Sequence, residues 1–355
     1  MERREKEGMR NTNGIRFSVA MCTYNGEAYI REQLQSILDQ DVPVDEIVVS
    51  DDGSADHTVE IVKEVLSQSG IRHEIIVNKK NLGFRKNFEQ AIGRTQGEII
   101  FLADQDDIWK REKVRVTWKH FQENPDCLLV FSNAVVVAED RKPQTMDLWD
   151  SVLLKKELHP QMDWKRLFLK GWYVTGAAAA IRRTLFEEAI PFPATCYHDA
   201  WLGMRAALCD GIEAEPEKLL CYRQHAENQI GTAASEAARW KKRLRVLQSA
   251  GEIQIELHRQ YALMYREIEQ GFPDFLSEDS AFLGELKACI QYHQDMAELG
   301  DMCVSERLRT IAHYYREGSF KRFAKNAAAM RGDLFYALGR RQAEGAGDHS
   351  SVGRA

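Results

Sequence analysis

Short apolar runs alternate with amphipathic segments between residues 17 and 137 of the chain. The apolar runs are rich in β-prone residues and are bounded by turn-forming residues, so each of them predicts a buried strand. The predicted strands are 17–23, 46–50, 73–78, 97–103 and 127–137. The segments between them carry apolar residues at helical spacing and predict helices at 28–40, 57–70, 87–94 and 111–123. This alternation predicts an α/β fold with a mostly parallel central sheet flanked by helices.

Beyond residue 137 the alternation weakens. The pattern predicts a polar loop at 138–147, a helix near 164–169 and further elements of the same domain at 171–183 and 218–225. Helical spacing then dominates to residue 340, and the last residues are small and polar. We therefore predict a flexible tail at 1–14, a main α/β domain at 15–231, a helical region at 232–340 and a disordered tail at 341–355.

Composition and charge narrow the classes of partner. The chain has 355 residues, of which 44% are hydrophobic and 29% are charged, which is typical of a folded protein. Its 48 Lys and Arg residues do not outnumber its 54 Asp and Glu residues, so we expect no nucleic-acid partner. It contains no apolar stretch long enough for a spanning helix, and the charged N-terminus does not resemble a secretory signal.

The cysteines indicate the compartment. There are seven of them, they are scattered, and no two form a C-x-x-C pair. They are typical of reduced thiols in a cytosolic protein. We therefore expect a cytoplasmic protein that is either free or peripheral at the inner face of the cytoplasmic membrane.

Two acidic residues, Asp51 and Asp52, follow the predicted strand at 46–50. In open α/β sheets, ligands bind beyond the carboxyl ends of the strands. One of these carboxylates is therefore a candidate to accept hydrogen bonds from a nucleotide base or ribose. The equally weighted alternative is an Asx turn, because Asp, Gly and Ser favour such turns.

Three further carboxylates, Asp104, Asp106 and Asp107, follow the predicted strand at 97–103. Either Asp106 or Asp107 could cap the next helix, which would leave the other carboxylates repelling one another. A bound cation would relieve that repulsion. Oxygen ligands select Mg²⁺ or Mn²⁺, and a metal held by one or two carboxylates keeps positions free for phosphate oxygens.

Two more motifs carry groups suited to catalysis. Asp199 follows His198 at the start of an apolar helical run, where it is a candidate general base; the alternative is a simple helix N-cap. Arg223 and His225 lie close together near residue 224. Arginine is suited to binding a diphosphate, and histidine is a common metal ligand.

Taken together, these motifs resemble those of the family 2 glycosyltransferases, which have the nucleotide-sugar-binding fold called GT-A. The resemblance covers about residues 17 to 231, and seven segments occur in the order of the family. They are "CTYNGEAYIREQLQSILDQ", "IVVSDDGSADHT", "NLGFRKNFEQAI", "GEIIFLADQDDIW", "TGAAAAIRRTLFEEAIPFP", "HDAWLG" and "YRQHAENQIG". The resemblance implies a GT-A catalytic domain followed by a helical C-terminal region.

The resemblance also implies roles for individual residues. It places Thr23, Tyr24, Asp52, Arg85 and Asp104 at the donor nucleotide. The D-x-D motif is Asp104 to Asp106, with Asp106 as the direct metal ligand, Asp104 beside it and His225 completing a Mn²⁺ or Mg²⁺ site. Asp199 falls at the position of the catalytic base. His198 and Arg223 are candidates for contacts with the diphosphate or the acceptor.

The function implied is inverting transfer of a sugar from a nucleotide-diphosphate donor to a hydroxyl of a growing cell-surface polysaccharide or lipid-linked glycan. The motifs "HDAW" and "YRQH" look most like those of bacterial polysaccharide rhamnosyltransferases, which makes dTDP-rhamnose a candidate donor beside UDP-sugars. One departure is His198, where many relatives have Glu. The alternative function is a nucleotide-sugar-binding homologue or sensor without catalysis.

Basic and aromatic residues mix at 239–247 and 320–325. Solvated helix faces packed on the catalytic domain are the simpler interpretation. The alternative hypothesis is that these stretches hold the protein against anionic lipid, near a lipid-linked acceptor.

Overall fold

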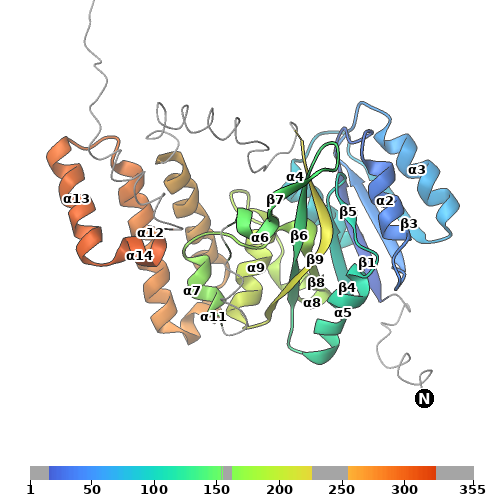
Figure 1. Ribbon diagram of the computed structural model, residues 1–355. Helices are drawn as coiled ribbons and strands as arrows, with labels where there is room; N and C mark the ends of the chain where they lie inside the picture. Colours follow the sequence, from blue (N-terminus) through green and yellow to red (C-terminus); the bar gives the residue numbers. More distant parts are fainter. Residues whose placement is uncertain (1–15, 153, 155–161, 226–254, 325–355) are drawn as a thin grey trace, which may run out of the picture.

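The computed structural model describes residues 16–152, 154, 162–225 and 255–324 (Figure 1). The predicted domain boundary near residue 231 and the two predicted tails lie outside these residues, so the predicted domain limits stay predictions. In Figure 1 the strands occupy one side of the molecule and the C-terminal helices the other.

One mixed sheet contains all the strands of the described residues. Its order is β3-β2-β1-β4-β8-β6-β9-β5, and β7 pairs with β6. The strands are β1 (Phe17–Thr23), β2 (Glu46–Asp51), β3 (Arg72–Val77), β4 (Ile99–Ala103), β5 (Ile108–Trp109), β6 (Leu129–Ala138), β7 (Pro143–Asp147), β8 (Ala179–Arg182) and β9 (Ile212–Gln224). The predicted α/β class is thus confirmed.

Parallel pairs of strands occur in two parts of the sheet. Strands β3, β2, β1 and β4 are parallel, as are β6 and β9, whereas β8, β5 and β7 pair antiparallel with their neighbours. The predicted polar loop at 138–147 is wrong in part, because β7 occupies its second half. That strand lies at an edge of the sheet and only its last residue, Asp147, is buried, so it has no apolar run that would predict it.

Helices cover both faces of the sheet and continue beyond it. They are α2 (Ile30–Leu38), α3 (Thr58–Ser69), α4 (Phe84–Arg94), α5 (Lys113–Glu123), α6 (Leu148–Ser151), α7 (Trp164–Phe168), the 3₁₀ turn η2 (Gly176–Ala178), α8 (Arg183–Ala189), α9 (His198–Leu208), a helix over 255–271, α11 (Pro273–Glu278), α12 (Ser280–Glu298), α13 (Val304–Arg316) and α14 (Ser319–Phe323). Every helix predicted before residue 170 is present within a few residues of its predicted ends.

The alternation of side chains along β1 explains why its whole length is apolar. Val19 and Met21 lie in one hydrophobic core, with residues of α2 and α5, whereas Ala20 and Cys22 lie in a second core with residues of α4 and α9. Successive residues of a strand point to opposite faces, and both faces of this sheet are covered. A continuous apolar run is therefore what the fold requires here.

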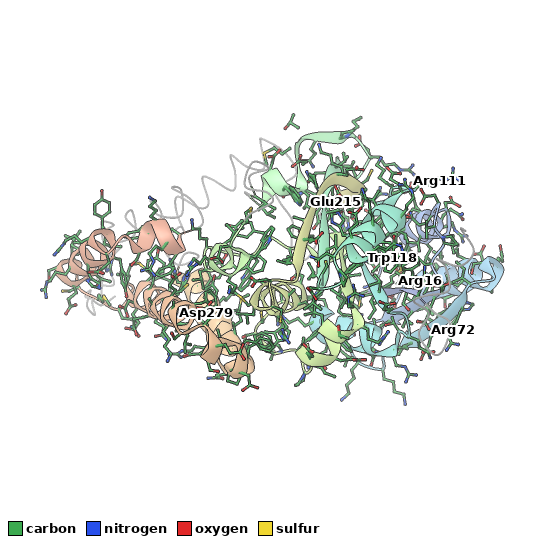
Figure 2. All side chains as sticks on the ribbon, turned by 90° about the horizontal axis from the view of Figure 1, so that it is seen from below. Arg16, Arg72, Arg111, Trp118, Glu215 and Asp279 are labelled. Carbon is green, nitrogen blue, oxygen red and sulfur yellow. The ribbon has the colours of Figure 1, made fainter. Side chains whose placement is uncertain are left out.

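The C-terminal helices pack against the helices that cover the second core. The Tyr265 hydroxyl donates a 2.6 Å hydrogen bond to the Phe168 carbonyl at the end of α7. The Trp201 ring of α9 stacks on Phe272 at 4.2 Å between centroids, and Lys165 forms a salt bridge with Asp279 at 3.1 Å. Figure 2 shows Asp279 at the opposite end of the molecule from Arg72, on the β3 edge of the sheet.

In the described part of the second basic segment, residues 320–324, the aromatic side chains are not available for contact with lipid. Phe320 and Phe323 are buried among the C-terminal helices, so their rings face the protein core. The other basic segment, 239–247, lies outside the described residues. Among the helices that the structure describes, none has both the length and the apolar composition needed to cross a membrane.

Candidate functional site

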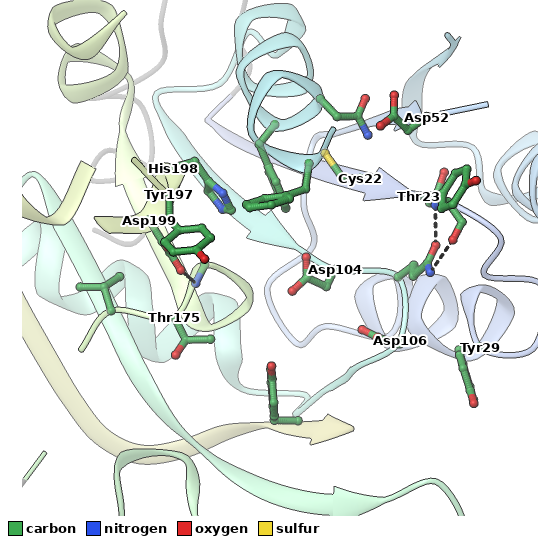
Figure 3. Close-up of a pocket in the computed structure, with 18 of the residues that line it drawn as sticks. Cys22, Thr23, Tyr29, Asp52, Asp104, Asp106, Thr175, Tyr197, His198 and Asp199 are labelled. Atoms are coloured by element: carbon green, nitrogen blue, oxygen red, sulfur yellow. Dashed lines mark hydrogen bonds between the residues drawn. The ribbon is translucent and has the colours of Figure 1, made fainter. Parts of the chain in front are cut away.

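A cavity of about 640 Å³ lies at the carboxyl ends of β1, β2 and β4 (Figure 3). Thr23 ends β1, Asp52 follows β2 and Asp104 follows β4, while Asp199 reaches the cavity from α9. Eight of the ten residues singled out from the sequence line this cavity. They are Thr23, Tyr24, Asp52, Asp104, Asp106, His198, Asp199 and His225. Carboxylates far apart in the sequence are therefore brought to one space.

The loop after β4 is fixed by hydrogen bonds from neighbouring loops. The Gln105 side chain accepts from the Tyr24 amide at 2.8 Å and donates to the Tyr24 carbonyl at 3.0 Å (Figure 3). Gln33 of α2 donates to the Asp104 carbonyl at 3.1 Å. Helix α5 begins at Lys113 after Glu112, so the alternative in which Asp106 or Asp107 caps it is wrong.

The carboxylates of this loop lie in an environment that favours a cation. Burial, together with the negative charges of Asp106 and Asp199, raises the pKa of Asp104 to about 7. Burial also raises the pKa of Asp107, again with Asp106 adding to the effect. The nearby Lys113 is itself buried, and burial lowers its pKa to about 7. A divalent cation would stabilise the ionised form of these carboxylates.

Asp106 and His225 form the pair that could hold such a cation. His225 Nε2 lies 2.7 Å from Asp106 Oδ2, and the imidazole stacks on the Tyr29 ring at 4.7 Å. Two ligand atoms at ~2.1 Å from Mg²⁺ in adjacent octahedral positions are about 3 Å apart, so this spacing suits one shared ion. Within the described ranges, no group of three or more His, Cys, Asp or Glu side chains could hold a metal. The pair therefore fits a Mg²⁺ or Mn²⁺ ion whose other ligands are phosphate oxygens and water.

Arg223 does not line the cavity, and its predicted contact with the diphosphate or the acceptor stays a prediction. It is buried behind the loop, where its Nε donates to the Asp106 carbonyl at 2.8 Å and its backbone amide donates to Asp107 Oδ1 at 3.0 Å. Its Nη2 forms a salt bridge with Glu32 at 2.7 Å. Arg223 thus fixes the position of Asp106 from behind.

Replacing Arg223 by Met should lower the free energy of unfolding by about 2 kcal/mol, because Glu32 and the loop carbonyl lose a buried partner. The matched control is Arg141→Met, because Arg141 binds the other oxygen of Glu32 at 2.8 Å but its side chain is 65% exposed. The control should change stability by less than about 0.5 kcal/mol. Urea denaturation of both variants measures the difference, and equal effects would contradict this role of Arg223.

Arg85 also lies outside the cavity lining. Its Nη1 donates to the Ala194 carbonyl at 2.6 Å, and its guanidinium lies 5.1 Å from the Tyr197 ring centroid. These contacts hold the segment that precedes α9. Contact of Arg85 with the nucleotide, which the resemblance implied, stays a prediction.

Of the two acidic residues at the end of β2, one forms the predicted turn and the other lines the cavity. Asp51 forms the turn, because its carboxylate accepts from the Gly53 and Ser54 amides and from the Thr23 hydroxyl. Asp52 lines the cavity, and its carboxylate accepts from the Leu82 amide at 2.7 Å and the Gly83 amide at 2.9 Å. Asp52 therefore also anchors the turn that leads into α4.

Asp199 lies in the first turn of α9, and the residue before that helix is Tyr197, so Asp199 is not its N-cap. Its Oδ2 accepts from the Gly176 amide at 3.1 Å, and its Oδ1 accepts from the Ala200 amide at 2.8 Å. The arrangement holds a carboxylate in a fixed direction beside the cavity.

Several residues of the cavity wall could not be picked out from the sequence. Tyr29, Phe84, Phe88, Gly176 and Tyr197 all line it. A Cβ at Gly176 would lie 2.6 Å from His198 Nε2, so the close approach of this backbone requires glycine. Gly176 lies in the predicted element at 171–183 and in the segment "TGAAAAIRRTLFEEAIPFP" of the resemblance, but neither assigned a role to it.

Comparison with known proteins gives consistent matches. The family model described as glycosyl transferase family 2 matches residues 18–190. The dTDP-rhamnosyl transferase RfbG of Shigella flexneri is 32% identical over 238 residues, which cover 62% of this chain and 77% of that protein. An uncharacterized protein of Mycobacterium tuberculosis is 25% identical over 265 residues, or 71% of this chain and 72% of that protein.

Among solved structures, S. aureus TarS 1-349 in complex with UDP-GlcNAc has a similar fold. The TM-score is 0.51 at 20% sequence identity, and the match covers 93% of both chains. At this identity the likeness concerns the fold, and it extends over the sheet and the helices that follow it.

Proposed function

The chain belongs to glycosyl transferase family 2 and has the GT-A fold, and from this we propose that it moves a sugar from a nucleotide-diphosphate donor to a glycan hydroxyl in a single inverting displacement. The observation that carries the proposal is the convergence of Asp52, Asp106 and Asp199 on one cavity. Asp52 and Asp106 follow β2 and β4, Asp199 lies in the first turn of α9, and each is suited to a different part of a nucleotide sugar.

In this proposal the donor nucleotide lies along the carboxyl ends of β1 and β2. Thr23, Tyr24 and Asp52 would contact the nucleoside, and Asp52 would accept a hydrogen bond from the base with the acceptor capacity that its loop contacts leave. Asp106 and His225 would bind Mg²⁺ or Mn²⁺ at the diphosphate, and Asp104 would lie beside Asp106. Such an ion supplies positive charge that stabilises a departing nucleoside diphosphate.

Asp199 is proposed as the base. Its two oxygens are held by the Gly176 and Ala200 amides, so the carboxylate keeps one direction while an acceptor hydroxyl approaches. As the hydroxyl oxygen attacks the anomeric carbon, its proton passes to Asp199, and the bond to the diphosphate oxygen breaks on the opposite face. Fixing the two reactants in this cavity supplies a further part of the rate.

The donor and acceptor are proposed as classes. RfbG is named as a dTDP-rhamnosyl transferase, and the TarS structure holds UDP-GlcNAc, so dTDP-rhamnose and UDP-sugars are the donors to test. We propose a cell-surface polysaccharide or a lipid-linked glycan as the acceptor, with the enzyme in the cytoplasm or peripheral at the inner face of the cytoplasmic membrane.

A donor screen tests the function. Binding of dTDP-rhamnose, UDP-GlcNAc and UDP-glucose is measured by calorimetry with Mg²⁺ or Mn²⁺, and release of the nucleoside diphosphate is measured in parallel. We expect one donor to bind and to release its nucleotide at a rate that depends on the metal. Tight binding without release or transfer would instead favour a sensor, and the absence of binding to any nucleotide sugar would contradict the proposal.

A further inference from the structure

His198 is held rigidly in the wall of the cavity. Its side chain is 6% exposed and lines the same cavity as Asp199. The imidazole stacks on the Phe88 ring, with 4.1 Å between centroids and an interplanar angle of 20°, and the edge of the Phe84 ring meets it at 6.2 Å. Figure 3 shows the imidazole beside Asp199 and Tyr197. The two α4 rings fix its plane, so His198 presents its ring atoms in one orientation.

Neither ring nitrogen of His198 has a hydrogen-bond partner among the described residues, although both are buried. A buried polar atom without a partner costs about 1–3 kcal/mol, and most such atoms in proteins are satisfied. Burial also lowers the pKa of His198, so the imidazole is neutral at neutral pH. A neutral imidazole has one donor nitrogen and one acceptor nitrogen.

The donor nitrogen and the acceptor nitrogen of His198 indicate what kind of ligand group could bind there. A diphosphate offers only acceptors and can therefore pair only with the donor nitrogen, whereas a hydroxyl can pair with either ring nitrogen. The Nε2 atom lies against Gly176, since a Cβ there would be 2.6 Å away, and the Gly176 amide binds Asp199. Of the two nitrogens, Nε2 is therefore beside the carboxylate that we propose as the base, at the sugar end of the site.

We propose that His198 hydrogen-bonds a sugar hydroxyl next to the reacting centre and so selects substrates that carry this hydroxyl. The inference rests on the proposed transfer function and adds a specificity-determining residue to it. The hydroxyl can belong to the donor sugar or to the acceptor, because both meet beside Asp199. A site that hydrogen-bonds a substrate hydroxyl discriminates strongly against analogues that lack it, because its buried polar group is then left unpaired.

The test compares His198→Leu with His198→Gln, because Gln keeps a donor and an acceptor whereas Leu removes both. Calorimetry measures the affinity of each variant for dTDP-rhamnose and dTDP, and for UDP-GlcNAc and UDP. If the hydroxyl is the donor's, the Leu variant binds the nucleotide sugar about 10-fold more weakly and the nucleoside diphosphate as wild type does. If it is the acceptor's, donor affinity and donor hydrolysis are unchanged and the KM for the acceptor rises about 10-fold.

In both cases the Gln variant should recover part of the loss. The inference is overturned if the Leu variant loses affinity equally for nucleotide sugar and nucleoside diphosphate, or if neither donor affinity nor acceptor KM changes. Thermal unfolding of each variant separates these effects from misfolding, and Gly176→Ala, which crowds Nε2, provides a second route to the same loss. Failure of the transfer function itself would appear in the wild-type protein, which would then bind no nucleotide sugar.

Discussion

Replacement of Asp199 by Asn is expected to lower the rate of sugar transfer about 10²–10⁴-fold, the range that a positioned general base contributes. Asn has the same shape, and its side-chain oxygen can still accept from the Gly176 amide, so α9 and the cavity wall should keep their structure. The amide cannot take the proton of an acceptor hydroxyl. Donor affinity should therefore stay within about twofold while turnover is lost.

The measurement is a pair of assays on the same preparation. Calorimetry gives the affinity for the donor identified in the screen, and nucleotide release in the presence of acceptor gives the transfer rate. Asp210→Asn is the matched control, because Asp210 is exposed just after the same helix. Transfer at the wild-type rate by Asp199→Asn would assign the base to another residue.

The buried strands could be predicted because burial on both faces requires an unbroken run of apolar residues, and such a run is visible in the sequence. Strand β1 occupies the predicted 17–23, since a strand buried on both faces must be apolar throughout. Strand β9 runs from Ile212 to Gln224, but only 218–225 was singled out, because its first half is broken by Glu and Pro216. Edge strand β7 was not predicted either. Both strands have exposed positions, and exposed positions need not be apolar, so the apolar run that predicts a strand is absent.

The positions of the site residues could be predicted better than the directions of their side chains. Ends of parallel strands meet at one edge of a sheet, so Asp52 and Asp104 had to lie near each other. The direction of a long side chain depends on neighbours distant in sequence. Arg223 turns away from the cavity because Glu32 of α2 and the Asp106 carbonyl bind it, and no local pattern announces those partners.

The two histidines of the cavity also show that the neighbours of a side chain are not predicted by local sequence. No local pattern predicts that His225 lies 2.7 Å from a carboxylate, or that His198 lies between aromatic rings and a glycine. The two imidazoles face different parts of one cavity and have different chemistry. The neighbours that distinguish them come from the loop after β4 and from α4.

Removal of the Asp106 carboxylate is expected to abolish the dependence of turnover on Mg²⁺ or Mn²⁺. The metal proposal assigns Asp106 and His225 as the protein ligands, so Asp106→Ala leaves a single ligand and a cavity with less negative charge. Loss of several kcal/mol of charge stabilisation at the leaving diphosphate corresponds to a rate about 10²–10³-fold lower. Asp106→Asn is the matched variant, because it keeps a hydrogen-bonding group toward His225 while removing the charge.

Both variants should lose metal binding, and wild-type metal binding should itself depend on pH. Since the pKa of Asp104 is raised to about 7 by burial and by Asp106 and Asp199, Asp104 is mostly protonated below pH 7, and a cation must displace that proton to gain its charge. Affinity for Mn²⁺, titrated by calorimetry, should therefore fall as the pH is lowered from 8 to 6. Full metal-dependent turnover by Asp106→Ala would contradict the assignment, because Asp106 is the carboxylate that we assign to bind the metal together with His225.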